Sequence, residues 1–318
     1  MLQYVNNPKI GLVLGSGGAR GYAHLGVLKV LYEEGIHIDL IVGTSFGSII
    51  GAAYAAGCDI YELEKIALEI GWIKLLKMVD IAPPKGIFAG NKLESFFSSL
   101  TRQKHFSELK VPLAVVTTDI KTGEEVLISK GSVSRAILAS SALPGIFAPV
   151  KIDDRWLVDG SLVNPLPIQT AFDMGADMVI AVDVSSPIDN ISQLMALKKY
   201  LKIFSQNLYY QIPSADNIVS LNRISNKFQC IIPTGFTIIG RALNVLHNNQ
   251  GKMVVIPDDD SVVIIKPRVE NIRWRDFHHA QRCIELGVEA ANHVLHDIKI
   301  KTPNLYSKIG LKIEGVKP

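Results

Sequence analysis

A short strand, a glycine-rich loop and a helix follow one another in residues 11–31, GLVLGSGGARGYAHLGVLKVL. The strand, Ile10–Leu14, carries no strongly polar side chain, which is typical of a strand buried within a sheet. Four of the seven residues at positions 15–21 are glycines. Glycines let backbone N–H groups turn toward a ligand, and the start of the following helix adds positive potential. The stretch therefore predicts an α/β fold whose first loop is suited to an anion or an oxyanion.

Short apolar runs and helical patterns continue to alternate along the chain. The expected strands are Ile10–Leu14, Leu40–Val42, Val111–Thr118, Glu125–Ser129, Trp156–Val158, Met178–Val182 and Ser261–Lys266. The expected helices are His24–Glu34, Phe46–Ala56, Ile60–Met78, Asn91–Leu100, Val133–Ser140, Ile168–Met174 and Asp276–His296. Continuous apolar strands separated by helices predict a mostly parallel central sheet with helices on both faces, a three-layer α/β/α architecture.

Composition divides the chain into three parts. Residues 9–189 contain the regular alternation and predict the catalytic α/β core. Residues 190–260 show no obvious strand at first and include a stretch, 191–229, with five basic residues and one acidic residue. We expect this part to be a variable region, a candidate lid or membrane-facing segment. Residues 261–300 are expected to add a final strand and helix to the same domain.

Charge and cysteine content exclude several classes of protein. The 318 residues include 33 basic and 30 acidic side chains, a net charge of +3, which is too balanced for a dedicated nucleic-acid-binding protein. Three widely spaced cysteines form neither a zinc pattern nor a disulfide framework. No secretory leader is recognisable, and no apolar run reaches the roughly 18–20 residues of a membrane span. We expect a cytoplasmic protein, and the sequence leaves open whether it also contacts the inner face of the membrane. The sequence does not indicate the oligomeric state.

The second expected strand runs into the pentapeptide GTSFG (43–47), which precedes a helix. In this context G-x-S-x-G is typical of a nucleophile elbow, a strained turn that presents Ser45 at a helix N-terminus. A helix-capping serine on an ordinary loop is the alternative. Because loops that follow neighbouring parallel strands lie at one sheet edge, Ser45 and the glycine-rich loop are expected to be neighbours. That combination of a nucleophile with backbone donors suits acyl transfer.

A dinucleotide-binding loop fits the first fifty residues less well. Arg20 occupies the place of the third glycine in G-x-G-x-x-G. The acid expected after the second strand is missing, because Asp39 lies before that strand and the pentapeptide follows it.

A serine nucleophile needs a base, and the residues alone leave its identity open. None of the eight histidines follows a strand end, although a Ser–Asp–His triad remains an alternative. Three aspartates do follow strands, Asp119, Asp159 and Asp183, and each also fits a role as turn former or helix cap.

Several stretches in matching order and spacing resemble the patatin-like phospholipase family, in particular its bacterial members of the neuropathy-target-esterase type. They are GLVLGSGGARGYAHLGVLKVL (11–31), GTSFGSIIGAAYAAG (43–57), VPLAVVTTDIKTGE (111–124), ASSALPGIFAPV (139–150), LVDGSLVNPLP (157–167) and GADMVIAVDV (175–184). The resemblance covers about residues 9–189, weakens through 190–260 and resumes loosely toward the end of the chain.

The resemblance implies a Ser–Asp dyad that works without histidine, with Ser45 as nucleophile and Asp159 as base. It places the oxyanion hole at the main-chain N–H groups of Gly17, Gly18 and Ala19. Supporting motif positions are Gly15, Arg20, Gly43, Gly47 and Gly160. Arg20 is also a candidate to steady anionic head groups. No metal and no cofactor are implied.

Together with the elbow and the glycine-rich loop, the resemblance implies a serine lipid acyl hydrolase of the phospholipase A, lysophospholipase or esterase type. Its expected partner is a phospholipid or another lipid ester. A transacylase or a thioesterase with the same dyad is the first alternative. A noncatalytic lipid-binding regulator is the second, and the presence of both Ser45 and Asp159 counts against it.

Overall fold

The computed structural model describes residues 8–69, 90–144, 146–185, 242 and 260–301. Nearly all of the predicted variable region, 190–260, lies outside these residues, and so does the second half of the predicted helix Ile60–Met78.

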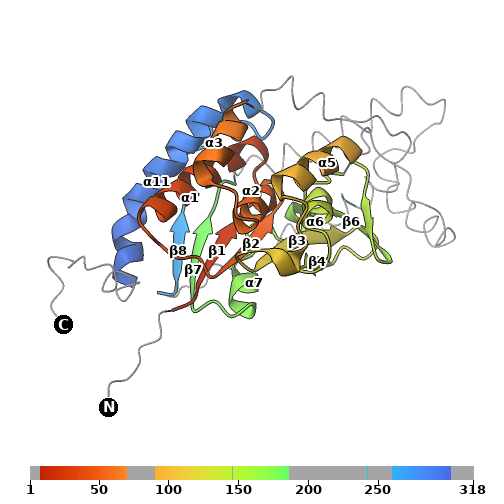
Figure 1. Ribbon diagram of the computed structural model, residues 1–318, viewed down its shortest axis with the longest axis horizontal. Helices are drawn as coiled ribbons and strands as arrows, with labels where there is room; N and C mark the ends of the chain where they lie inside the picture. Colours follow the sequence, from red (N-terminus) through yellow and green to blue (C-terminus); the bar gives the residue numbers. More distant parts are fainter. Residues whose placement is uncertain (1–7, 70–89, 145, 186–241, 243–259, 302–318) are drawn as a thin grey trace, which may run out of the picture.

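The described strands form one sheet in the order β5-β6-β3-β2-β1-β7-β8, with β4 paired to β3 (Figure 1). The strands are β1 Ile10–Leu14, β2 Leu40–Thr44, β3 Leu113–Asp119, β4 Glu125–Ile128, β5 Val150–Ile152, β6 Arg155–Asp159, β7 Met178–Val182 and β8 Val262–Ile265. Strands β3, β2, β1, β7 and β8 run parallel, whereas β4, β6 and β5 are antiparallel to their neighbours. The predicted mostly parallel sheet is therefore confirmed.

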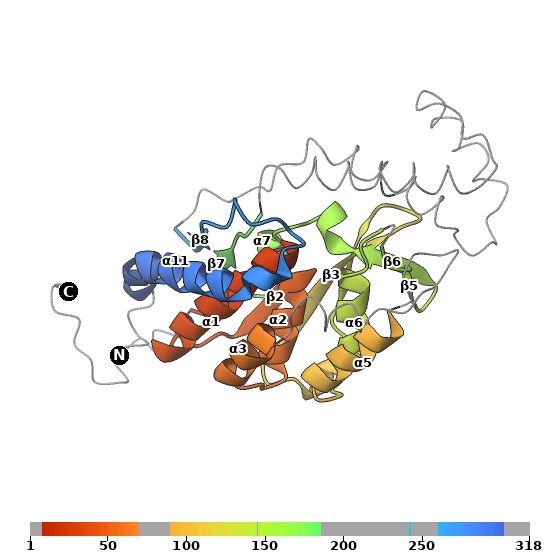
Figure 2. The same cartoon turned by 90° about the horizontal axis from the view of Figure 1, so that it is seen from above.

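Helices cover both faces of this sheet unequally. The described helices are α1 Ala23–Glu33, α2 Phe46–Ala55, α3 Ile60–Glu69, α5 Asn91–Leu100, α6 Val133–Ser140, α7 Ile168–Asp173 and α11 Ala280–Lys301. In Figure 2, α7 lies across the sheet from the row formed by the other helices. Two apolar clusters follow from this arrangement, a large one on the crowded face and a smaller one that includes residues of α7. The described residues thus form three layers, as predicted.

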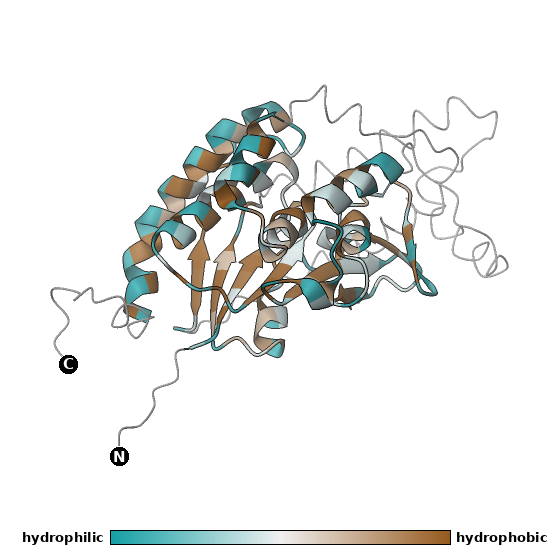
Figure 3. Cartoon of the chain, in the orientation of Figure 1, coloured by the Kyte–Doolittle hydropathy of each residue, from teal (hydrophilic) through white to brown (hydrophobic). Residues whose placement is uncertain are grey.

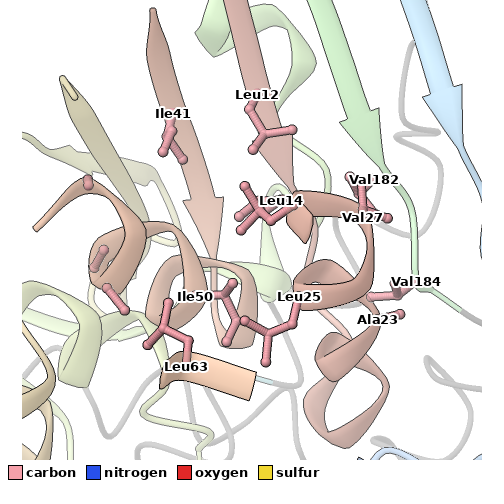
Figure 4. Packing of buried hydrophobic residues seen from close by; sticks show 14 of the residues in the cluster. Leu12, Leu14, Ala23, Leu25, Val27, Ile41, Ile50, Leu63, Val182 and Val184 are labelled. Carbon is pink, nitrogen blue, oxygen red and sulfur yellow. The ribbon is translucent and has the colours of Figure 1, made fainter. Parts of the chain in front are cut away.

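The central strands consist mainly of hydrophobic residues (Figure 3), and these residues belong to the apolar clusters between the sheet and its helices. Figure 4 shows Leu12 and Leu14 of β1 directed toward Ile50 of α2 and Leu25 of α1. All four side chains are buried. Their burial fixes α1 and α2 against the sheet, so the two loops that lead into these helices are held on a rigid support.

The last helix packs backbone to backbone on the first. A Cβ atom built on Gly26 of α1 would lie 2.0 Å from the carbonyl oxygen of Ile284, and one built on Gly287 of α11 would lie 2.1 Å from that of Ala23. Strand β8 pairs with β7 in the same sheet. The final strand and helix are therefore built into this sheet and its helical layer.

The structure adds one strand that the apolar pattern did not reveal. Strand β5, with the sequence VKI, forms a hairpin with β6 through a turn in which Asp153 has φ 51°. The strand is short, charged at its centre and exposed there, so it lacks the apolar run by which buried strands are recognised. The last helix also differs from its prediction, since a 3-10 turn at Phe277–His279 precedes α11 and α11 continues to Lys301.

Candidate active site

Ser45 stands on a sharp turn between β2 and α2. Its backbone angles, φ 53° and ψ −123°, lie in a region that non-glycine residues rarely adopt. The turn is tight because glycines flank it. A Cβ atom on Gly43 would lie 2.6 Å from Cα of Ser48, and one on Gly47 would lie 2.1 Å from the carbonyl oxygen of Leu14. The strand–turn–helix geometry is that of a nucleophile elbow.

Neighbouring serines hold the strained turn in place. The backbone N–H of Ser45 donates to Oγ of Ser140 at 2.8 Å, and the Ser140 hydroxyl donates in turn to the carbonyl oxygen of Val116 at 2.7 Å. Ser140 is completely buried at the end of α6. Its partner is the backbone of the elbow, 95 residues away in sequence.

Asp159 reaches Ser45 because β6 runs antiparallel to β3. This orientation brings the end of β6 back along β3, so that Asp159 pairs with Thr117, while Val116 pairs with Thr44 on the other side. Asp159 thereby arrives beside the residue that follows β2. The Ser45 hydroxyl donates to Oδ2 of Asp159 at 2.7 Å, and the backbone N–H of Ser161 donates to Oδ1 at 2.9 Å.

The Asp159 carboxyl group is buried, with 4% of the residue exposed. Burial raises the pKa of Asp159 above its ordinary value of 3.8, and the hydrogen bonds from Ser161 and Ser45 oppose that shift. Because a carboxylate with a raised pKa binds a proton more strongly, this aspartate is a better base than an exposed one.

The raised pKa of Asp159 predicts the acid side of the pH–rate profile. If its carboxylate is the base, kcat/KM falls as pH is lowered through the pKa of the free enzyme. The midpoint of this fall is expected above 3.8, in the direction set by burial. Rates on a soluble ester from about pH 3 to pH 9 measure it, with circular dichroism at each pH to verify folding. A midpoint at or below 3.8 in folded protein would contradict this pKa assignment.

The glycine-rich loop wraps around the first turn of α2, beside Ser45. A Cβ atom on Gly47 would lie 2.7 Å from the carbonyl oxygen of Gly15, and one on Gly21 would lie 2.4 Å from the ring of Phe46. The predicted proximity of the loop and the elbow is therefore confirmed. The N–H groups of Gly17 and Gly18 have no acceptor among the described residues. Donors of this kind are what an oxyanion requires.

Ala19, in contrast, is wrongly placed in the predicted set of donors. Its N–H donates to the carbonyl oxygen of Trp274 at 2.7 Å, in the segment that precedes α11. A donor that is already bonded to a protein acceptor is not free to bind an oxyanion. The available donors in the loop are therefore Gly17 and Gly18.

A side chain at Gly17 should damage this arrangement. A Cβ atom there would lie 2.5 Å from Cγ2 of Val184, so the loop must shift in Gly17→Val. Loss of one oxyanion donor costs about 3–4 kcal/mol, and we expect kcat to fall by about 10²–10³-fold with a smaller change in KM. Initial rates on a soluble ester measure both constants. The control is Gly17→Ala combined with Val184→Ala, which removes the clashing methyl group and should recover much of the loss. An unaltered kcat in Gly17→Val would contradict the loop as oxyanion hole.

The structure also argues against contact between Arg20 and lipid head groups. Only 2% of the residue is exposed, and its guanidinium Nε donates to the carbonyl oxygen of Gly17 at 3.3 Å. The peptide plane of that carbonyl also carries the N–H of Gly18. A side chain directed into the protein does not reach head groups at the surface; Arg20 instead braces the loop from within.

The remaining candidates have structural partners. Asp119 accepts the N–H of Lys121, and Asp183 accepts that of Ser185 and lies 3.3 Å from Nζ of Lys266. No histidine in the described part of the chain is hydrogen-bonded to Ser45 or Asp159; the histidines of α11 and the turn before it are exposed, and His24 contacts the carbonyl oxygen of Gly15. Ser45 and Asp159 are therefore hydrogen-bonded directly, without an intervening imidazole.

Close packing of the backbone explains why a glycine follows Asp159. A Cβ atom on Gly160 would lie 2.4 Å from the carbonyl oxygen of Val116, so only glycine allows β6 to end this close to β3. Gly15 is similarly confined, since its Cβ would lie 3.0 Å from the carbonyl oxygen of Val182.

Sequence reasoning missed the contribution of the segment before α11. Besides the Trp274 carbonyl, this segment provides Phe277, whose ring centroid lies 6.3 Å from those of Tyr22 and Phe46. Tyr22 and Phe46 themselves meet edge to face at 4.9 Å. These aromatic side chains tie the loop, the elbow helix and the end of the chain together. No local signal in the sequence joins them, because the partners are more than 200 residues apart.

Within the described residues, no group of three or more histidine, cysteine or acidic side chains is arranged to hold a metal ion. None of the helices described combines the length and the apolar character needed to cross a bilayer.

The chain is similar in sequence to known proteins. The sequence profile of the family described as Patatin-like phospholipase matches residues 12–172. An uncharacterised NTE family protein of Mycobacterium bovis is 35% identical over 181 residues, which cover 57% of this chain and 50% of the relative. Patatin-like phospholipase domain-containing protein 6 of Mus musculus is 39% identical over 185 residues, covering 56% of this chain and 14% of the mouse protein.

Among solved structures, VipD from Legionella pneumophila aligns with 91% of this chain and 67% of its own, at 14% identity and a TM-score of 0.46. The alignment with the mycobacterial relative spans half of that protein, and the alignment with the mouse relative a much smaller share. The matched profile covers half of the chain and includes both Ser45 and Asp159. The chain belongs to the patatin-like phospholipase family.

Proposed function

We propose that this protein is a serine acyl hydrolase that cleaves carboxylic esters of lipids through a Ser45–Asp159 dyad. The observation that carries the proposal is the 2.7 Å hydrogen bond from the Ser45 hydroxyl to Asp159 Oδ2, on a strained elbow beside unbonded loop N–H groups. A nucleophile, a base in contact with it and backbone donors nearby are the parts that acyl transfer requires.

In the first half of the reaction, Ser45 Oγ attacks the ester carbonyl carbon while Asp159 takes the hydroxyl proton. The carbonyl oxygen gains the negative charge and is stabilised by the N–H groups of Gly17 and Gly18. The positive potential at the start of α2 favours the same charge. Collapse of the tetrahedral intermediate breaks the ester C–O bond. The departing alcohol takes the proton from Asp159, and the acyl group remains on Ser45.

In the second half, water takes the place of the alcohol. Asp159 removes a proton from this water as its oxygen attacks the acyl carbon, and the same loop donors stabilise the second oxyanion. The intermediate then releases the fatty acid, and Ser45 Oγ recovers its proton from Asp159. One carboxylate thus acts as base and then as acid in each half, so no histidine is needed.

The lipid substrate is inferred from the family and from the names of relatives. Besides the mouse protein, a Drosophila melanogaster relative that is 32% identical over 197 residues is named neuropathy target esterase. Phe46, the residue after Ser45, lies beside Phe277, and both rings are only partly buried, so they offer apolar contact area near the nucleophile. Peripheral contact with a lipid surface is part of the proposal, since membrane lipids reside there.

Isotope labelling tests the reaction class. Purified protein is incubated with phosphatidylcholine and lysophosphatidylcholine vesicles in water enriched in ¹⁸O, and released fatty acids are analysed by mass spectrometry. Hydrolysis places one ¹⁸O atom in each fatty acid released, and Ser45→Ala should release none above background. Acyl chains recovered on an added alcohol acceptor, without labelled acid, would show transacylation instead. Vesicle binding without any product would identify a lipid-binding protein.

A further inference from the structure

His24 is a fully buried residue in the first turn of α1 that the proposed reaction does not use. Its Nε2 lies 2.8 Å from the carbonyl oxygen of Gly15. A carbonyl oxygen only accepts, so Nε2 carries the proton and donates it. Nδ1 is then an acceptor, and this buried atom has no hydrogen-bond partner in the described part of the chain. The imidazole therefore makes a single hydrogen bond, and that bond goes to the first residue of the glycine-rich loop.

If stability were the only requirement, a buried imidazole with a single hydrogen bond would be an unfavourable choice at this position. Burial of an unsatisfied polar atom destabilises a fold, and native proteins hold few such atoms. Burial also lowers the pKa of His24 to about 4, against the opposing effects of the Gly15 carbonyl and the Asp183 charge. The ring is thus neutral at pH 7, as a single proton on Nε2 requires. A leucine would fill the same space without leaving a polar atom unpaired.

The bond from His24 immobilises one peptide unit of the loop. The carbonyl of Gly15 and the N–H of Ser16 belong to the same planar peptide. His24 holds the carbonyl side, and the carbonyl oxygen of Pro165 accepts the N–H of Ser16 at 2.9 Å. The N–H of Gly15 is bonded as well, to Val182 at 3.1 Å. The next N–H groups along the chain, those of Gly17 and Gly18, are the proposed oxyanion donors.

We infer that His24 is a positioning residue that fixes the direction of the oxyanion donors by holding the Gly15–Ser16 peptide plane. The inference rests on the proposed function, because it gives His24 a role in the same reaction. It assigns to a histidine outside the dyad an effect on transition-state stabilisation. His24 itself does not contact the substrate or exchange a proton with it.

Two amide substitutions separate positioning from packing. In His24→Gln the amide nitrogen stands as many bonds from Cβ as Nε2 does, so it is able to reach the Gly15 carbonyl. In His24→Asn the same buried amide is one bond shorter and falls short of it. His24→Leu removes the donor and keeps an apolar side chain of similar bulk. Thermal unfolding and circular dichroism identify which variants fold.

Kinetics on a soluble p-nitrophenyl ester give the first result. We expect kcat of His24→Gln to stay within about threefold of the wild type. We expect kcat of His24→Asn and His24→Leu to fall about 10–100-fold, while KM stays within about twofold of the wild type. This decrease in kcat is smaller than the one expected for complete loss of an oxyanion donor, because the donors are misdirected rather than removed. Equal kcat in the glutamine and asparagine variants, or a leucine variant as active as the wild type, would overturn the inference.

Hydrogen–deuterium exchange gives a second result that does not depend on activity. Peptides covering residues 12–22 should exchange faster in His24→Leu than in the wild type, whereas His24→Gln should exchange at nearly the wild-type rate. Unchanged exchange in His24→Leu would overturn the positioning role even if the enzyme proved inactive. A wild-type protein without esterase activity would instead contradict the proposed function, so the two failures are distinguishable.

Discussion

Ser45→Ala is expected to abolish ester hydrolysis while leaving the protein folded. Loss of the nucleophile in a serine hydrolase lowers kcat by about 10⁶-fold. The fold should persist because Ser45 is only half-buried and its backbone N–H keeps its bond to Ser140. Initial rates on a soluble ester, together with the thermal unfolding midpoint, measure both effects.

Ser95→Ala is the matched control for that experiment. Ser95 is exposed on α5, and its hydroxyl bonds only to the carbonyl oxygen of Asn91 in the same helix. Its removal should leave kcat unchanged. A folded Ser45→Ala protein that retained a tenth of the wild-type kcat would exclude Ser45 as the nucleophile.

Asp159→Asn is expected to remove activity and to stabilise the protein at the same time. The amide keeps an oxygen for the Ser161 N–H and still fits beside Ser45, but it does not accept the proton. We expect kcat to fall by about 10⁴-fold, at the upper end for loss of a general base.

The stability effect of Asp159→Asn has a sign set by the pKa. A carboxyl group whose pKa is raised in the folded state is favourable while protonated, and its ionisation destabilises the fold as pH rises through that pKa. The neutral asparagine avoids this loss, so the free energy of unfolding in urea should exceed that of the wild type at pH 8. The difference should shrink at pH 4.

Asp119→Asn provides the comparison for the aspartate variant. Asp119 also follows a strand, but its carboxylate accepts the N–H of Lys121 in a turn. This variant should keep most of the wild-type kcat. Loss of activity equal to that of Asp159→Asn would mean that the contact between Asp159 and Ser45 does not identify the base.

Much of this architecture could be predicted from local signals. The apolar run of β1, the glycines after it and the GTSFG pentapeptide are contiguous features, and each reflects a constraint that acts between neighbours along the chain. Gly43 and Gly47, for example, are required by the approach of α2 to the adjacent strands. Such constraints leave a direct mark on the sequence.

The choice of base could not be made from local signals. Asp119, Asp159 and Asp183 all follow strands, and only the antiparallel return of β6 beside β3 separates them. That return depends on a hairpin whose first strand, β5, has no recognisable apolar pattern. The resemblance to a known family pointed to Asp159 where the residues alone left three candidates.

Contacts between distant segments explain the two corrections in the loop. Ala19 was wrongly counted as an oxyanion donor because its acceptor, the Trp274 carbonyl, lies 255 residues later. Arg20 was named as a candidate for contact with anionic head groups, and its burial, which is rare for an arginine, removes that candidacy. Neither the acceptor nor the burial leaves a signal near positions 19 and 20.

Covalent labelling tests the Ser45–Asp159 dyad most directly. A fluorophosphonate probe reacts fastest with a serine that a neighbouring base activates, and peptide mapping by mass spectrometry locates the adduct. We predict one adduct, on the peptide that contains Ser45, with labelling absent in Ser45→Ala and at least 100-fold slower in Asp159→Asn, whose base is lost. An adduct on another residue, or labelling of Asp159→Asn at the wild-type rate, would contradict the dyad.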